Sequence, residues 1–186
     1  MQKLVLIGAS TGGPGHIKKL LHDIKIGSNT ILIAQHMNKL FLPSFASQLE
    51  RETGVTSELL SQRSLLKSGC IYVCDQNFEL TDALPLSAKP SEAVTTYSPN
   101  VDLLFHSGVK ILKNIKTMAI LLTGIGDDGA KGLNELQKAG AKCLAESEES
   151  AIVYGMPKRA LELNPNIKSL SLMSIKKELE EFLNVF

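Results

Sequence analysis

The chain has 186 residues, of which 44% are hydrophobic, and this is enough for one well-buried core. Its 20 basic and 19 acidic residues nearly cancel, so its overall charge does not favour binding to nucleic acid or to an anionic membrane. No apolar run reaches the roughly 18 residues that span a bilayer, and no charged leader precedes the first predicted strand. We therefore expect a single cytoplasmic domain over residues 1–186, without membrane insertion.

The first quarter of the chain alternates between predicted strands and helices. Residues 4–7 form an aliphatic run before a glycine, which is typical of a strand buried on both faces of a parallel sheet. Apolar residues then recur at helical spacing between Ile17 and Ile24, with Pro14 near the helix start. Residues 30–34 predict a second buried strand, and residues 43–50 predict a second helix.

The middle of the chain is less regular. It contains three short segments that resemble strands, at residues 55–60, 70–74 and 78–81, separated by polar turns. Residues 89–100 are rich in Ser, Thr and Pro and predict a surface loop. The apolar positions that follow predict a helix over residues 101–112.

Regular alternation resumes in the last third. It includes a buried strand at 118–122, a helix at 130–138 closed by Gly140, and short strands at 143–145 and 151–153. A final helix has an apolar inner face: Ile175, Leu179, Phe182, Leu183 and Phe186. The whole pattern predicts an α/β fold, a three-layer sandwich with a largely parallel, doubly wound sheet and helices on both faces.

Three loops that leave predicted parallel strands carry a hydroxyl, an imidazole and two carboxylates. They contain Ser10, His36 and the pair Asp127 and Asp128, respectively. Because parallel crossovers return the chain to the same end of the sheet, loops that follow such strands emerge on one edge. We therefore expect these side chains to meet at that edge, where open α/β proteins bind ligands.

The first of these loops, residues 8–12, fits the GxSxG pattern of a nucleophile elbow. Glycines on both sides of Ser10 allow the strained turn from strand to helix that exposes the serine oxygen. The helix starts just afterwards, so its free amides lie where the negative charge of a tetrahedral intermediate would develop. A glycine-rich packing turn or phosphate-binding turn is the alternative interpretation.

The other two loops supply a candidate base and a candidate orienting carboxylate. His36 directly follows an aliphatic strand, which places it at the rim, where a half-buried histidine without a function is the alternative. Asp127 and Asp128 precede a helix, so one of them is also a candidate N-cap. Their joint occurrence favours a triad of Ser10, His36 and Asp128. The remaining histidines are interpreted as structural or solvated: His16, His22 and His106.

These residues lie in motifs that resemble the catalytic domain of the protein-glutamate methylesterases of bacterial chemotaxis, the CheB family. Five motifs occur in order over nearly the whole chain: IGASTGG (7–13), AQHM (34–37), PNVDLLFHS (99–107), LLTGIGDDGAKG (121–132) and the segment 145–157, which closes on YGMP. The resemblance implies that Ser10 is the nucleophile, His36 the general base and Asp128 the residue that orients the imidazole. It also places the oxyanion hole near the backbone of Thr11 and Ile125.

The resemblance further implies a serine hydrolase that removes methyl groups from glutamate methyl esters of chemoreceptors. Deamidation of receptor glutamines is a plausible second activity of such a site. The expected partners are the cytoplasmic helices of methyl-accepting chemotaxis receptors, and neither a cofactor nor a metal is expected. Many family members carry a receiver domain ahead of the hydrolase, whereas this sequence starts at the first hydrolase strand, so no receiver domain is expected.

Two other classes of function remain open. A Rossmann-like module that binds phosphate or a nucleotide would explain the glycines, but the first loop lacks GxGxxG spacing and no acidic residue ends the second strand. A metal-dependent hydrolase would use His36, Asp127 and Asp128, which are few ligands. The three cysteines have no paired spacing, which predicts reduced core thiols: Cys70, Cys74 and Cys143.

Overall fold

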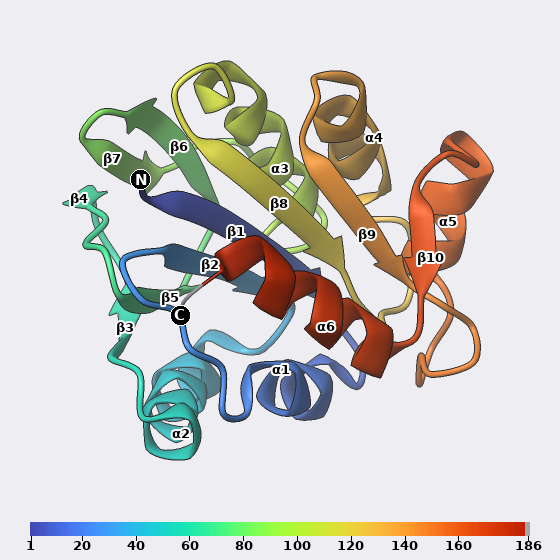
Figure 1. Cartoon of the computed structure of the whole chain (residues 1–186), viewed down its shortest axis with the longest axis horizontal. Helices are drawn as coiled ribbons and strands as arrows, with labels where there is room; N and C mark the ends of the chain where they lie inside the picture. Colours follow the sequence, from blue (N-terminus) through green and yellow to red (C-terminus); the bar gives the residue numbers. More distant parts are fainter. Residues whose placement is uncertain (185–186) are drawn as a thin grey trace.

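The fold is organised around a seven-stranded sheet in which every pair of neighbouring strands is parallel (Figure 1). The computed structural model describes residues 1–184 of the chain. The spatial order of the strands is β10-β9-β8-β1-β2-β5-β3. Their bounds are β1 Lys3–Ala9, β2 Thr30–Gln35, β3 Ser57–Leu60, β5 Cys70–Cys74, β8 Lys116–Leu121, β9 Lys142–Glu146 and β10 Lys168–Leu170.

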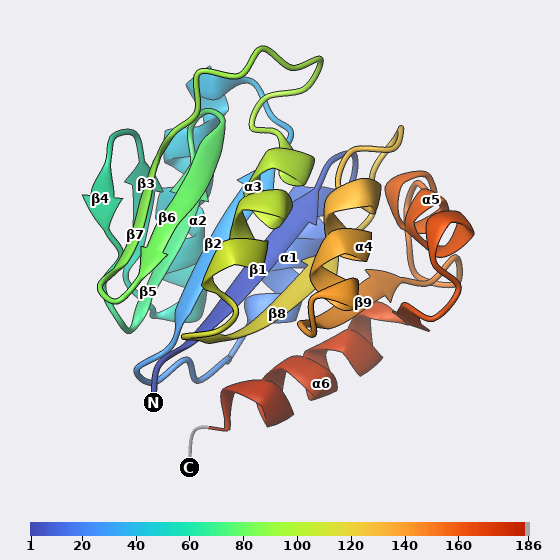
Figure 2. The same cartoon turned by 90° about the horizontal axis from the view of Figure 1, so that it is seen from above.

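Helices cover both faces of this sheet (Figures 1 and 2). One face carries α1 (Gly13–Leu21), α2 (Leu42–Thr53) and α6 (Leu172–Leu183), and the other carries α3 (Val101–Gly108), α4 (Ala130–Lys138) and α5 (Met156–Leu163). Because neighbouring side chains of a strand point to opposite faces, Val5 and Ile7 join one core cluster while Leu4 and Leu6 join the other. The predicted three-layer α/β fold is confirmed.

A second, three-stranded antiparallel sheet packs against the α3 side of the molecule. Its strand order is β4 (Ser64–Leu65), β7 (Leu86–Pro90) and β6 (Phe78–Ala83). Phe78 and Leu80 of β6 lie in the same core cluster as Phe105 of α3. The sequence predicted most of β6 but not this sheet, because β4 has two residues and β7 ends on Lys89 and Pro90, which were assigned to the surface loop.

Some predicted elements differ from the structure. The predicted strand at 151–153 is wrong, because these residues form a loop whose Val153 amide donates to the hydroxyl of Thr123 instead of joining a ladder. The predicted helix 101–112 is α3 followed by the short 3-10 helix η2 (Val109–Ile111). A second such helix, η1 (Lys39–Phe41), precedes α2. Phe186 of the predicted final apolar face lies outside the described residues.

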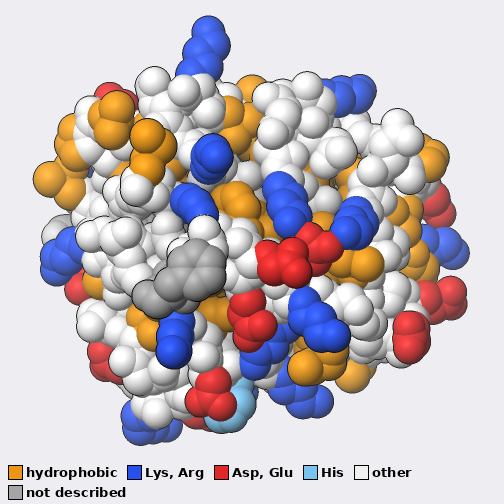
Figure 3. Space-filling view, viewed as in Figure 1, with side chains coloured by type: hydrophobic (Ala, Val, Ile, Leu, Met, Phe, Trp, Pro, Cys, Tyr) orange, Lys and Arg blue, Asp and Glu red, His pale blue; other side chains and the backbone are white. Residues whose placement is uncertain are grey.

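The surface charges and the cysteines agree with what the sequence predicts. Acidic and basic side chains are interspersed on the face seen in Figure 3. Within residues 1–184, no helix combines the length and apolarity needed to cross a bilayer. The three cysteines are free and buried, and burial raises the pKa of the Cys143 thiol to about 12.

The position of β1 determines where the loops meet. The chain leaves β1 for β2 on one side and later returns with β8 to the other side. Strand order therefore reverses at β1, and the crevice beyond the carboxyl ends of β1 and β8 is the topological switch point of the sheet. The loops that contain Ser10 and Asp128 follow these two strands directly.

Replacement of a core leucine in α4 tests how much this packing contributes. Leu133 is fully buried, so we expect Leu133→Ala to lower the free energy of unfolding by about 2–5 kcal/mol, through lost burial and the cavity that remains. Met173 is 60% exposed, and Met173→Ala should change this free energy by less than about 0.5 kcal/mol. Urea denaturation of both variants measures the difference. Equal effects would contradict the assignment of Leu133 to the core.

Candidate active site

The backbone of Ser10 is held by hydrogen bonds to Thr123 and Gly13. Ser10 directly follows β1 and is only 7% exposed. Its amide donates to the carbonyl of Thr123 at 3.0 Å, and its carbonyl accepts from the amide of Gly13 at 2.8 Å. The second bond closes the turn into α1, so the predicted turn from strand to helix is present, but its left-handed residue is Gly12 and not Ser10.

Gly12 meets two separate requirements of this turn. Its φ of 81° lies in the left-handed region, which side chains other than glycine disfavour. An added Cβ would lie 2.7 Å from Cγ1 of Ile152, which is closer than real contacts allow. The residue after Ser10 and Thr11 is therefore restricted to glycine by backbone conformation and by the neighbouring loop.

His36 lies beside Ser10 because of the register of two strands. β1 and β2 pair with Ala9 opposite Gln35, so the next residues along the two strands are Ser10 and His36. The His36 amide donates to the carbonyl of Ala9 at 3.0 Å. The buried side-chain amide of Gln35 donates to the carbonyls of both Ser10, at 2.8 Å, and His36, at 2.9 Å. Sequence analysis missed this contribution of Gln35.

Asp128 accepts three hydrogen bonds with its buried carboxylate. His36 Nε2 lies 2.6 Å from Oδ2, and the amides of Val101 and Asp102 each donate at 2.8 Å. These two amides are at the N-terminus of α3, where the helix dipole favours a negative charge. The candidate N-cap role at the following helix is wrong for both aspartates, because the N-cap of α4 is Gly129 and the first-turn amide of Gly132 donates to Asp102 Oδ1.

The bond to Asp128 determines which nitrogen of His36 can act as a base. A carboxylate only accepts, so the proton in this bond is on Nε2 and the lone pair is on Nδ1. Nδ1 is buried and has no hydrogen-bond partner among residues 1–184, so no hydrogen bond joins Ser10 to His36 in this structure. Such a bond is often long in free enzymes and tightens when substrate binds. The triad of Ser10, His36 and Asp128 therefore stays a prediction.

An aromatic ring that sequence analysis did not single out covers His36. The Tyr97 ring stacks on the imidazole, with ring centroids 4.8 Å apart and planes 9° from parallel. Asn77 holds the loop that carries Tyr97, since its side chain donates to Thr95 Oγ1 at 2.9 Å and accepts from the Asn100 amide at 2.8 Å. The only sequence signal was one aromatic residue in a loop rich in Ser, Thr and Pro.

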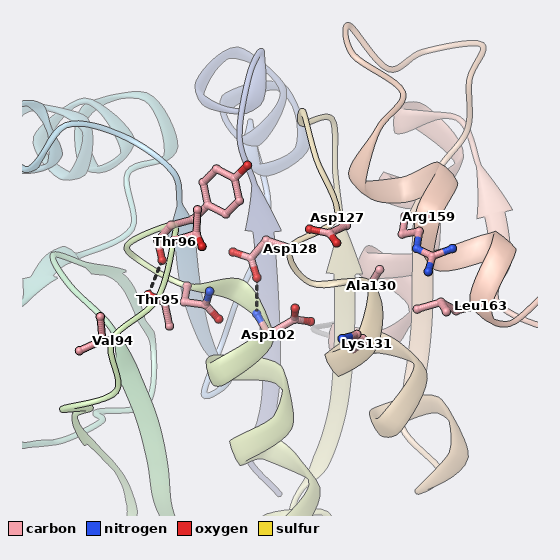
Figure 4. A pocket seen from close by; sticks show the side chains of 12 residues that line it. Val94, Thr95, Thr96, Asp102, Asp127, Asp128, Ala130, Lys131, Arg159 and Leu163 are labelled. Atoms are coloured by element: carbon pink, nitrogen blue, oxygen red, sulfur yellow. Dashed lines mark hydrogen bonds between the residues drawn. The ribbon is translucent and has the colours of Figure 1, made fainter.

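A pocket of 310 Å³ opens beside the contacts of His36 (Figure 4). Asp128 and Tyr97, which both contact His36, line it together with Lys131 and Arg159. Burial raises the pKa of Asp102, which lines the same pocket, and the nearby carboxylate of Asp128 adds to this effect. In the described part of the chain, no three His, Cys, Asp or Glu side chains are grouped so that they could hold a metal ion.

The two residues predicted for the oxyanion hole both lie close to Ser10. Thr11 is the next residue, and its carbonyl accepts from the hydroxyl of Thr123 at 2.9 Å. Gly124, which precedes Ile125, packs so tightly on Ser10 that an added Cβ would lie 2.8 Å from the serine Cβ. Both Thr11 and Ile125 are exposed to solvent. The use of their amides as donors to an oxyanion stays a prediction.

Comparison with known protein families shows the family of the chain. Residues 5–179 match the protein family described as CheB methylesterase. The chain belongs to the CheB methylesterase family. The predicted family resemblance is confirmed. All three predicted triad residues lie within the matched segment.

Curated CheB relatives carry the name protein-glutamate methylesterase/protein-glutamine glutaminase. The protein from Photorhabdus laumondii is 35% identical over 184 residues, and that from Escherichia coli K12 is 33% identical over 183 residues. Each match covers 96% of this chain but 52% of the relative, so the chain spans about half the length of these proteins. The crystal structure of the Thermotoga maritima CheB methylesterase catalytic domain superposes with a TM-score of 0.88 at 29% identity, covering 98% of this chain and 99% of that one.

A pair of glycine substitutions separates the two requirements at Gly12. Gly140 has a φ of 101° and no atom within 4 Å of an added Cβ, so Gly140→Ala should cost only the backbone strain of about 1–2 kcal/mol. We expect Gly12→Ala to lower the free energy of unfolding by about 1–3 kcal/mol more, because the new methyl group overlaps Ile152. Guanidinium denaturation measures both. Equal costs would mean that the loop of Ile152 does not restrict this turn.

Proposed function

We propose that this chain hydrolyses the methyl esters of glutamyl side chains in the cytoplasmic helices of methyl-accepting chemotaxis receptors, acting in the cytoplasm as a single catalytic domain. The observation that carries the proposal is the His36–Asp128 bond of 2.6 Å, which leaves the lone pair on Nδ1 of the residue that lies beside Ser10. Family membership and the names of the curated relatives support the same reaction.

In the first half of the proposed reaction, Ser10 Oγ attacks the carbonyl carbon of the ester and its proton passes to Nδ1 of His36. The carbonyl oxygen takes up the negative charge beside the start of α1, near the amides of Thr11 and Ile125. The bond between the carbonyl carbon and the methoxy oxygen then breaks. His36 returns the proton to this oxygen, methanol leaves, and the glutamyl group remains as an ester of Ser10.

In the second half, water takes the place of the alcohol. His36 removes a proton from the water as it attacks the acyl-serine, and then returns the proton to Ser10 Oγ. The products are the original serine and the carboxylic acid of the glutamyl side chain, which ionises by releasing a proton to solvent. Throughout both halves, Asp128 keeps the Nε2–H tautomer in place and stabilises the imidazolium that forms when Nδ1 is protonated.

A glutamine side chain can follow the same route. The acyl-serine would be identical, but His36 would deliver its proton to the amide nitrogen and ammonia would leave instead of methanol. We propose this deamidation as a second activity of the site, supported by the glutaminase half of the relatives' name. Because the acyl-enzyme is shared, every variant of the triad should lose both activities together.

Substitution of the triad tests the mechanism. We expect Ser10→Ala and His36→Ala each to lower kcat for methanol release from methylated receptor membranes by about 10⁴- to 10⁶-fold. Asp128→Asn should lower it by about 10³- to 10⁴-fold, since an amide that donates to Nε2 would move the imidazole proton to Nδ1. His106→Ala is the matched control and should keep the parental rate, because His106 is exposed and pairs with Glu135 away from the site.

The controls identify the cause of each unexpected result. Full methanol release by Ser10→Ala would exclude Ser10 as the nucleophile, whatever the other variants do. Loss of activity in His106→Ala would mean that the assay reports a general effect on the protein. Circular dichroism of every variant checks that the fold is retained.

The stacking of Tyr97 on His36 predicts a separate, smaller effect on kcat. We expect Tyr97→Leu to lower kcat by about 3- to 10-fold, because an aromatic pair stabilises the orientation of the imidazole by about 0.5–1.5 kcal/mol. Tyr97→Phe retains the ring and should stay within about twofold of the parent. Steady-state kinetics on the same membranes distinguishes the variants. Equal losses in both would attribute the effect to the hydroxyl group and not to the stack.

A further inference from the structure

A buried imidazole and a buried carboxylate lie behind the nucleophile turn and take no part in the proposed chemistry. The side chains of His16 and Glu146 are 8% and 0% exposed, respectively. His16 Nδ1 lies 2.8 Å from Glu146 Oε1, at ion-pair distance, although the ring is not oriented for a hydrogen bond. A carboxylate without access to water is costly unless polar groups surround it, so this pair needs a structural explanation.

The two oxygens of Glu146 connect the end of β9 to the chain beyond β8. Oε2 accepts from the amide of Thr123 at 2.8 Å, and Oε1 accepts from the hydroxyl of Ser150 at 2.9 Å. Ser150 Oγ accepts in turn from the amide of Leu172 at the start of α6. Glu146 therefore holds the peptide bond between Leu122 and Thr123 by accepting from its amide.

Thr123 in turn bonds to two consecutive residues of the nucleophile turn, Ser10 and Thr11. Its carbonyl accepts from the amide of Ser10 at 3.0 Å, and its hydroxyl donates to the carbonyl of Thr11 at 2.9 Å. The same hydroxyl accepts from the Val153 amide at 2.9 Å. Thr123 thus holds the peptide groups on either side of the Ser10–Thr11 peptide bond, and a shift of Thr123 would displace Ser10 with them.

His16 links the carboxylate to the other side of the same turn. It lies on α1, whose first residue, Gly13, closes the turn through its bond to the carbonyl of Ser10. The His16 amide donates to the carbonyl of Gly12 at 3.3 Å. The contact between His16 and Glu146 therefore joins the start of α1 to the Thr123 side of the nucleophile turn.

We propose that Glu146 is a positioning residue for Ser10, acting through Thr123, and that His16 stabilises its carboxylate in the buried position. This inference rests on the proposed role of Ser10 as the nucleophile. Neither side chain reaches a reacting atom, so the expected signature is a loss in the rate of acylation without a matching change in substrate binding. A misplacement of about 1 Å at a reacting group can cost about 100-fold in rate.

The test compares variants that keep or remove the acceptor for the Thr123 amide. The first readout is the rate at which a fluorophosphonate ester modifies Ser10, which depends on activation of the serine and not on recognition of a receptor. Steady-state kcat and KM for methanol release are the second readout, and thermal melting checks the fold. Glu178→Leu is the matched control, since it also removes a carboxylate, one that is paired with Lys142 and Lys168 outside the site.

We expect Glu146→Gln to react within about threefold of the parent, because its amide oxygen still accepts from Thr123. Glu146→Leu should react about 10- to 100-fold more slowly and lose kcat by a similar factor, with KM within about threefold. Glu178→Leu should change neither rate. A folded Glu146→Leu variant that is modified at the parental rate would overturn the proposal.

Variants of His16 keep the proposal testable if Glu146→Leu does not fold. His16→Ala leaves the buried carboxylate without its imidazole and should slow modification of Ser10. The double variant His16→Ala/Glu146→Gln needs no partner for a negative charge and retains the acceptor, so it should regain the parental rate within about threefold. A double variant as slow as His16→Ala would overturn the proposal. A parent protein that is not modified at Ser10 would instead contradict the proposed function.

Discussion

The carboxylate of Asp128 is the group on which the geometry of the site depends. It binds two amides at the N-terminus of α3 and one nitrogen of His36, so a single buried charge orients a helix and the candidate base together. Removal of one partner of a buried charge costs much more than a surface ion pair contributes. The start of α3 and the imidazole of His36 are thereby positioned together.

The parallel sheet brings the remaining groups to this carboxylate. Ser10, His36 and Thr123 all follow buried strands that are neighbours in space, β1, β2 and β8. Their backbone bonds to one another continue the hydrogen-bond pattern of the sheet beyond its last residues. The backbone of these three loops is therefore held in place by the same kind of hydrogen bond as the strands themselves.

The parts of this site that could be predicted from the sequence are those that depend on local patterns. β1, β2 and β8 each contain a run of buried apolar residues, so the loops that follow them, and with them Ser10, His36 and Asp128, could be located. Tyr97 and Glu146 had no such signal. The place of Tyr97 depends on Asn77, 20 positions earlier, and that of Glu146 depends on His16, 130 positions earlier. Residues 151–153 were mistaken for a strand because all three are apolar, whereas Val153 bonds to Thr123 through its backbone amide.

The orientation of the imidazole limits the distance over which His36 can act as a base. Of the two ring nitrogens, Nδ1 is the one nearer to the main chain, and here it is the one left unpaired. A base that uses this nitrogen has a short reach and suits a nucleophile on the adjacent strand, about 4.8 Å away. A slip of one residue between β1 and β2 would turn the ring to the opposite face of the sheet. Correct strand alignment during folding is thus also a condition for chemical competence.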